Sequence, residues 1–187
     1  KNNYDAPNSR NLINTPVAKR YNRAVIGSQR FNNGVALGED YLFNLEYFEK
    51  CNQICFLPYT DYFYNLINSS SATKKLRESD FEQIITLYHA GKTFRYSNEP
   101  CSDFDAMDKN LCVGGINLMQ LLCYSASPYC STVLKNWLSR EEFRYACRGN
   151  YGLPVKLRIP QILCRVKSAI GIRCFFGVKK FFSQYKQ

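Results

Sequence analysis

Two adjacent carboxylates, Glu39 and Asp40, stand where a glycine-punctuated loop gives way to an apolar run in this chain of 187 residues. Gly38 can take the non-helical backbone of a helix cap, and acids in a first turn are favoured by the exposed N–H groups and the positive end of the helix dipole. We therefore expect both carboxylates to be ionised and held at a fixed position. A carboxylate held in this way is suited to act as a general base.

The helix that must position these acids is predicted over about residues 39–51. Its many apolar side chains leave little polar surface beyond Asn44, Glu46 and Glu49, so the helix should pack on more than one side. A short helix or turn is expected before it, ending at Gly27. After it, residues 53–58 are typical of a buried strand ended by proline, and residues 59–66 of a second short strand.

Beyond a polar linker near residue 70, the sequence pattern becomes helical. One helix is expected to begin at Ser79 and to end near Gly91, and a later one is open to interruption at Gly114-Gly115. Residues 155–159 alternate with period two, but Pro160 follows at once and residues 161–169 are typical of a helix. Other helix starts are expected near Ser102 or Asp103, Pro128 and Ser139. The predicted fold class is α+β and predominantly helical, with one part at residues 1–70 and a helical region with a basic tail at 71–187.

The net charge of +10 is concentrated at one end of the chain. Residues 1–142 are neutral overall, whereas residues 143–187 hold ten Lys and Arg and no acid. Such asymmetry favours a polyanionic partner. The basic, aromatic tail suits an interfacial helix on an anionic membrane leaflet, and it equally suits a cover over the core with solvated charges. Nucleic acid is not expected, because no recognised motif is present.

Nine cysteines, with no C-x-x-C pair and only one histidine in the chain, argue against a zinc site. Most lie among apolar neighbours, which favours reduced cysteines in a reducing compartment over a disulfide framework. The chain has no apolar run long enough to span a membrane and no signal peptide at its start. The expected location is therefore cytoplasmic, with peripheral attachment to the inner face of the plasma membrane as the role for the basic tail.

Three sequence elements occur in an order and at a spacing that resemble a known family. They are Pro16-Val17-Ala18-Lys19-Arg20-Tyr21, then Arg30-Phe31 followed by Gly38-Glu39-Asp40-x-x-Phe43-Asn44-x-x-Tyr47, then Tyr62-Phe63-Tyr64-Asn65 with Ser69-Ser70-Ser71. Together they make the first 75 residues or so similar to the C-terminal half of family 2 glycosyltransferases, which have the GT-A fold. These bacterial enzymes build surface polysaccharides and lipid-linked saccharides.

The resemblance implies a catalytic role for the acids at the helix start. Asp40 would be the base that takes the proton of an acceptor hydroxyl during inverting transfer from a nucleotide sugar, and Glu39 would support it or contact the acceptor. Lys19, Arg30 and Asn33 would line the acceptor side of the site. The acceptor would be a saccharide or a lipid-linked saccharide.

The departures from the family pattern limit what the chain should do alone. Val17 and Ala18 replace an aromatic residue and Asn, and Asn65 replaces an Arg. The family's nucleotide-binding strands and its metal-binding Asp-x-Asp have no counterpart before residue 16. A divalent metal, Mn or Mg, is therefore expected in the full-length enzyme with ligands outside this chain, and the isolated chain is expected to be inactive.

Two alternatives remain open. Glu39 and Asp40 also fit the ordinary N-terminal acids of a structural helix. The whole chain also fits a non-catalytic helical module that binds an anionic membrane, or nucleic acid, through its basic tail. Asp103-x-Asp105 resembles a metal motif, but it follows the carboxylate helix in chain order and fits a capped helix start better.

Overall fold

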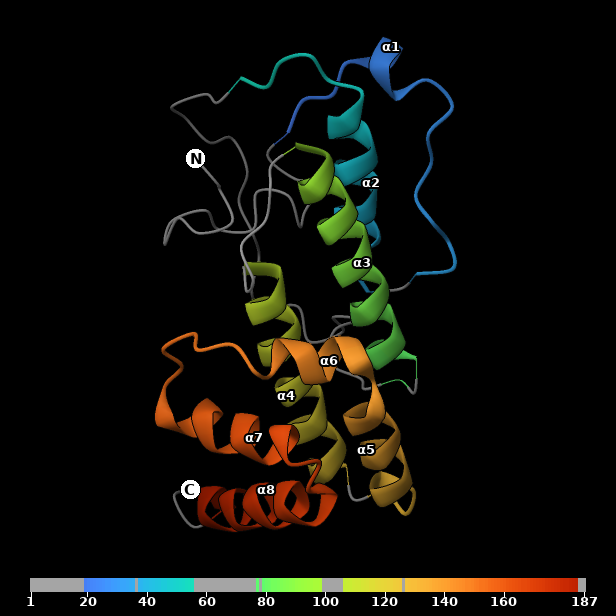
Figure 1. The fold of residues 1–187 in the computed structure, drawn as a ribbon. Coiled ribbons are helices and arrows are strands. Elements are labelled where there is room, and N and C mark those ends of the chain that lie inside the picture. Colours follow the sequence, from blue (N-terminus) through green and yellow to red (C-terminus); the bar gives the residue numbers. More distant parts are fainter. Residues whose placement is uncertain are drawn as a thin grey trace. The chain divides into compact units, whose positions relative to one another are not determined.

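A computed structural model describes residues 19–35, 37–55, 77, 79–98, 106–125 and 127–184, and within them it contains eight helices and no strand. The chain divides into two compact units, one of residues 1–75 with 89–100 and the other of residues 76–88 with 101–187. Helix α3 (Asp80–Asn98) contributes residues to both units (Figure 1). Each unit is described by itself.

The first unit contains the predicted carboxylate helix. Helix α1 (Arg23–Ile26) ends at Gly27, as the sequence predicted. Gly27 has a positive φ of 55°. Helix α2 (Glu39–Glu49) follows Gly38 and buries side chains over more than half of its circumference, with Glu46 and Glu49 exposed, which confirms the expected packing on more than one side. Asn44, however, is 0% exposed rather than part of the polar surface. A polar side chain at this depth requires hydrogen bonds inside the protein.

The second unit packs five complete helices and the start of α3 around one apolar core. The complete helices are α4 (Ala106–Tyr124), α5 (Cys130–Ser139), α6 (Glu141–Ala146), α7 (Val155–Arg165) and α8 (Ala169–Gln184). Helix α4 contacts each of the other four, so it forms the centre of the unit. The most deeply buried apolar side chains are Phe81, Ile116, Met119, Leu134, Leu138, Phe143, Ile172 and Phe176.

Aromatic rings connect the start of α3 to α5 and α6. The rings of Phe81 and Trp137 stack with centroids 4.6 Å apart, and the edge of Phe143 meets Phe81 at 5.4 Å. The hydroxyl of Tyr88 donates a hydrogen bond of 2.9 Å to Oδ1 of the fully buried Asp108. This pair makes Asp108 a structural residue between α3 and α4, while Asp103 and Asp105 lie outside the described residues.

The predicted α+β fold class is wrong for the described residues. Residues 53–55 have no regular secondary structure, and the rest of the two predicted strands, residues 56–66, lies outside the described part. Residues 155–159, which alternate with period two, form the first turns of α7. Their apolar residues at 155 and 159 are also one helical turn apart, so a short period-two pattern fits a helix as well.

Glycine and proline interrupt these helices less than the sequence suggested. Helix α3 continues through Gly91 to Asn98, and α4 runs unbroken through Gly114 and Gly115. Pro160 lies inside α7 with its ring buried, so packing compensates for the missing backbone donor. At Gly115 the glycine serves packing, because an added Cβ would overlap the ring of Phe143. Local propensity was outweighed by tertiary contacts at these places.

Within the described ranges, no helix combines the length and the apolar character needed to cross a bilayer.

Candidate functional site

Gly38 sets the start of α2 and thereby the place of the two carboxylates. Its φ of 85° and ψ of 22° are left-handed, a backbone that glycine adopts without steric cost. Its carbonyl oxygen accepts the first helical hydrogen bond from the amide of Leu42, at 3.1 Å. Glu39 and Asp40 therefore occupy the first turn, as the sequence predicted, and both are half-buried.

Tyr21 attaches the preceding segment to the side of α2. Its hydroxyl donates a hydrogen bond of 2.6 Å to Oδ1 of Asn44, and its ring meets those of Phe43 and Tyr47 edge-on, at 5.7 and 4.9 Å. The hydroxyl of Tyr47 in turn accepts a 2.8 Å hydrogen bond from the backbone amide of Asn22. These contacts explain why residues 19–22 lie beside the first turns of the helix.

Lys19 and Tyr21 belong to the electrostatic surroundings of Asp40. Burial raises the pKa of the Asp40 carboxyl, the neighbouring Glu39 raises it further, and Lys19 acts in the opposite direction. Burial lowers the pKa of Lys19, and the charge of Asp40 opposes that change. Burial, together with the charges of Asp40 and Tyr47, raises the pKa of Tyr21 to about 12.

The direction of the Asp40 shift differs from the expectation for a helix start. The positive end of the helix dipole favours the ionised carboxylate and alone would lower its pKa. In this site burial and the second carboxylate outweigh that effect. The ionised form of Asp40 therefore carries an energetic penalty, which gives this carboxylate more affinity for a proton than an exposed one has.

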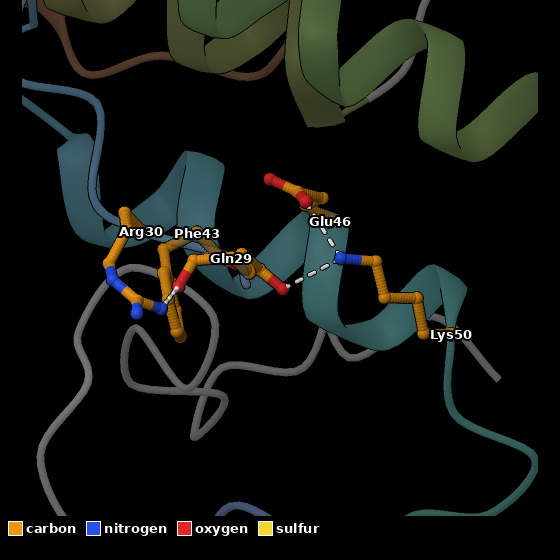
Figure 2. Close-up of polar contacts among 5 residues, drawn as sticks. All are labelled: Gln29, Arg30, Phe43, Glu46 and Lys50. Carbon is orange, nitrogen blue, oxygen red and sulfur yellow. Dashed lines mark hydrogen bonds and ion pairs between the residues drawn. The ribbon is translucent and has the colours of Figure 1, made fainter. Parts of the chain in front are cut away.

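A second polar network fixes the loop before α2 against the helix (Figure 2). The buried Gln29 donates from Nε2 to the carbonyl oxygen of Phe43 at 2.7 Å, and its Oε1 accepts from Nζ of Lys50 at 3.1 Å. Lys50 also pairs with Glu46 at 2.7 Å, one helical turn earlier. The loop is thus held at its beginning by Gln29 and at its end by the cap at Gly38.

The structure gathers only some of the predicted site residues. Glu39, Asp40 and Lys19 interact electrostatically, as described above. Arg30 is exposed, and its Nη1 donates a 2.7 Å hydrogen bond to the carbonyl oxygen of Gln29 (Figure 2). Asn33 lies exposed in the turn of the loop. Arg30 is not among the charges that shift the pKa of Asp40, so the structure assigns it to the loop.

The described residues offer no donor set for a metal ion. No group of three or more His, Cys, Asp or Glu side chains in this part of the chain is arranged to hold one. Glu39 and Asp40 are the two carboxylates at the start of α2, and they do not belong to such a group. The resemblance places the ligands of a divalent Mn or Mg ion outside this chain, so no chemical step is assigned to a metal.

Sequence reasoning missed Tyr21, Gln29 and Asn44 as the residues that position the site. Asn44 offered a signal, because an amide within an apolar helical run is buried only if it finds partners. The hydrogen bonds themselves join residues far apart in the sequence: Tyr21 and Asn44 are 23 residues apart, and Gln29 and Phe43 are 14 apart. No local sequence pattern predicts such tertiary contacts.

Comparison with known proteins adds no relative. Neither the family models, nor the curated proteins, nor the solved structures include a match to this chain.

Proposed function

We propose that this chain supplies the general base of an inverting glycosyltransferase, with Asp40 as the base. The observation that carries the proposal is the environment of Asp40, a half-buried carboxylate with raised pKa beside Glu39 and Lys19. An acid that only stabilises a helix start gains from ionisation. A carboxylate penalised for ionisation is more typical of groups that exchange protons.

In the proposed step, the acceptor hydroxyl gives its proton to Asp40 as its oxygen attacks the anomeric carbon of a nucleotide sugar. The new glycosidic bond forms while the bond to the nucleoside diphosphate breaks, and the diphosphate leaves with that electron pair. A base whose pKa lies nearer the working pH accepts the proton more readily. Lys19 limits the repulsion between two carboxylates, and Glu39 accepts a hydrogen bond from the acceptor.

The substrate class follows from the sequence resemblance. Nucleotide sugar as donor and a saccharide or lipid-linked saccharide as acceptor are the substrates of the family that the segment around Gly38-Glu39-Asp40 resembles. The cytoplasmic side of the plasma membrane is the corresponding place of action. By that resemblance, residues outside this chain would bind the donor and any divalent metal.

The test is a transfer assay on the protein in its complete natural form, with a panel of nucleotide sugars and with release of nucleoside diphosphate as the readout. Asp40→Asn removes the base and keeps the size of the side chain. We expect kcat to fall by about 10²–10⁴-fold, the usual contribution of general base catalysis, with an unchanged KM for the donor.

Glu49→Gln is the matched control, since it removes a carboxylate from an exposed position of the same helix that lies outside the network of Gln29 and Lys50. It should transfer sugar as the unsubstituted protein does. Full activity in a folded Asp40→Asn protein, or equal losses in both variants, contradicts the assignment.

A further inference from the structure

Helix α7 exposes an apolar stripe along the side that faces away from the core. Val155, Ile159, Ile162 and Val166 are 69, 42, 49 and 65% exposed. Their spacing of four, three and four residues places them on one face of a helix. The opposite face carries Pro160, Gln161 and Cys164, all buried. The stripe is therefore additional to the apolar residues that hold α7 in place.

Helix α8 has the same two-sided character. Ile172 and Phe176 are 0 and 1% exposed and face the core, whereas Ile170, Val178 and Phe181 are 78, 57 and 55% exposed. Cys174 and Gly177 are also exposed and occupy the same outer face by helical spacing. One side of α8 therefore covers the core and the other side is exposed to solvent, and each side has its own apolar stripe.

The two stripes belong to neighbouring helices of the second unit. Helices α7 and α8 pack side by side and both contact α4 (Figure 1). Gly171 permits their close approach, since a Cβ there would come within 2.8 Å of Cδ2 of Leu163. On each helix the stripe is opposite to the residues that face the core. We call the combined surface, formed by Val155, Ile159, Ile162, Val166, Ile170, Cys174, Val178 and Phe181, the α7–α8 face.

The charges around the α7–α8 face are of one sign. Residues 143–187 contain no acid, and Lys156, Arg158 and Lys167 are exposed cations beside the stripes. Arg165 and Arg173 are also exposed, but their guanidinium groups donate hydrogen bonds to the carbonyl oxygen of Cys147 and to Oγ of Ser131. Lys179 and Lys180 are directed inward instead, and their Nζ atoms donate to Oε1 of Gln120 and to the carbonyl oxygen of Tyr124, at 2.9 and 2.8 Å. An apolar surface bordered by cations complements a surface that is anionic outside and apolar beneath.

We propose that the α7–α8 face binds an anionic lipid membrane, with the stripes inserted between headgroups and the cations against lipid phosphates. A second copy of the chain would bring two cationic surfaces together, which like-charge repulsion opposes. Nucleic acid is bound through base stacking on aromatic rings, and the stripes are mainly valine and isoleucine.

The test is co-sedimentation of the full 187-residue chain with vesicles of phosphatidylcholine, with or without phosphatidylglycerol. We expect sedimentation only with phosphatidylglycerol, and weaker sedimentation at high salt. Val178→Asp places a carboxylate in the face and should reduce the bound fraction about tenfold, because burying an unpaired charge is costly. Gly177→Leu should increase it, since no atom lies within 4 Å of an added Cβ there.

Asn136→Asp is the matched control, because it adds the same charge at an exposed position of α5 and should bind as the unsubstituted chain does. A second test needs no substitution and measures the rate at which a membrane-impermeant maleimide alkylates Cys174, which belongs to the α7–α8 face. Anionic vesicles should slow this alkylation, and vesicles of phosphatidylcholine alone should not.

Four outcomes overturn the proposal. They are a chain that stays in the supernatant, a Val178→Asp variant that binds normally, binding of single-stranded RNA without binding of vesicles, and a dimer that Val178→Asp dissociates.

Discussion

Asp40 illustrates how neighbouring charges set the properties of one carboxyl group. Glu39 raises its pKa and Lys19 lowers it, in addition to the effect of burial. We therefore expect Glu39→Gln to lower the pKa of Asp40 and Lys19→Met to raise it. Titration of the Asp40 carboxyl carbon by NMR measures both shifts. Shifts of the opposite sign, or none, would show that the three groups are not neighbours.

Tyr21 provides a second titration, at alkaline pH. Its pKa of about 12 in the folded protein lies above the ordinary value of 10.0. The folded state therefore keeps this proton when the unfolded state has lost it, so the stabilising contribution is complete below about pH 10 and is lost as pH rises towards 12. Urea unfolding across this range should show a smaller pH dependence in Tyr21→Phe than in the unsubstituted chain.

The same variant also removes a hydrogen bond. At neutral pH Tyr21→Phe should lower the free energy of unfolding by about 1 kcal/mol, the typical net contribution of one such bond. A variant whose stability and pH dependence both match the unsubstituted chain would contradict the role of Tyr21 as the anchor of residues 19–22.

At the scale of the element, two adjacent glycines of α4 differ in what surrounds them. A Cβ at Gly115 would overlap the ring of Phe143, whereas at Gly114 the nearest atom, Cδ1 of Ile84, would be 3.9 Å away. Gly115→Ala should therefore destabilise the protein by about 1–3 kcal/mol through overpacking. Gly114→Ala should stabilise it by up to about 1 kcal/mol, the difference in helix propensity.

Urea unfolding of the two variants measures the contrast, and each serves as the control for the other. Equal effects of the two substitutions would mean that the ring of Phe143 does not rest on Gly115.

The elements also show what a sequence can and cannot predict. The start of α2 was predicted correctly, because the glycine, the two acids and the apolar run are all local signals. The first turns of α7 were not, because the alternating residues 155–159 fit a strand or one face of a helix. Its buried Pro160 is tolerated through contacts with the core, which no local pattern reveals.

Within the site, the sequence predicted the two carboxylates but not the residues that position them. Glu39 and Asp40 were recognisable from their position, whereas the pKa of Asp40 is raised by burial and lowered by Lys19. Both of these effects depend on how residues 19–22 lie against α2. Arg30 was expected at the site because of its place in the motif, but its guanidinium bonds to the backbone at Gln29 instead.

At the scale of the whole molecule, the cysteines report on burial. None of the eight cysteines in the described part forms a disulfide, and Cys112, Cys147 and Cys164 are buried. Hydrogen bonding to Cys147 and burial raise the pKa of the Cys112 thiol. Dithiothreitol should therefore leave Tm unchanged. Cys174 should be alkylated rapidly, and the buried thiols of Cys112, Cys130, Cys147 and Cys164 only after unfolding, as peptide mass spectrometry would reveal.

A Tm that falls on reduction would instead indicate a disulfide and contradict this arrangement. Rapid alkylation of Cys112 in the native protein would contradict its burial.

The stack of Phe81 on Trp137 has a kinetic consequence. The second unit is built from two separate stretches of chain, and this stack joins the shorter one to the longer one. The contact between Phe81 and Trp137 closes the loop of chain that lies between these two residues. Closing this loop costs conformational entropy, which must be met before the contacts across it form. Trp137 is the only tryptophan of the chain. A change in its fluorescence during refolding should therefore report the rate at which that loop closes, without any added label.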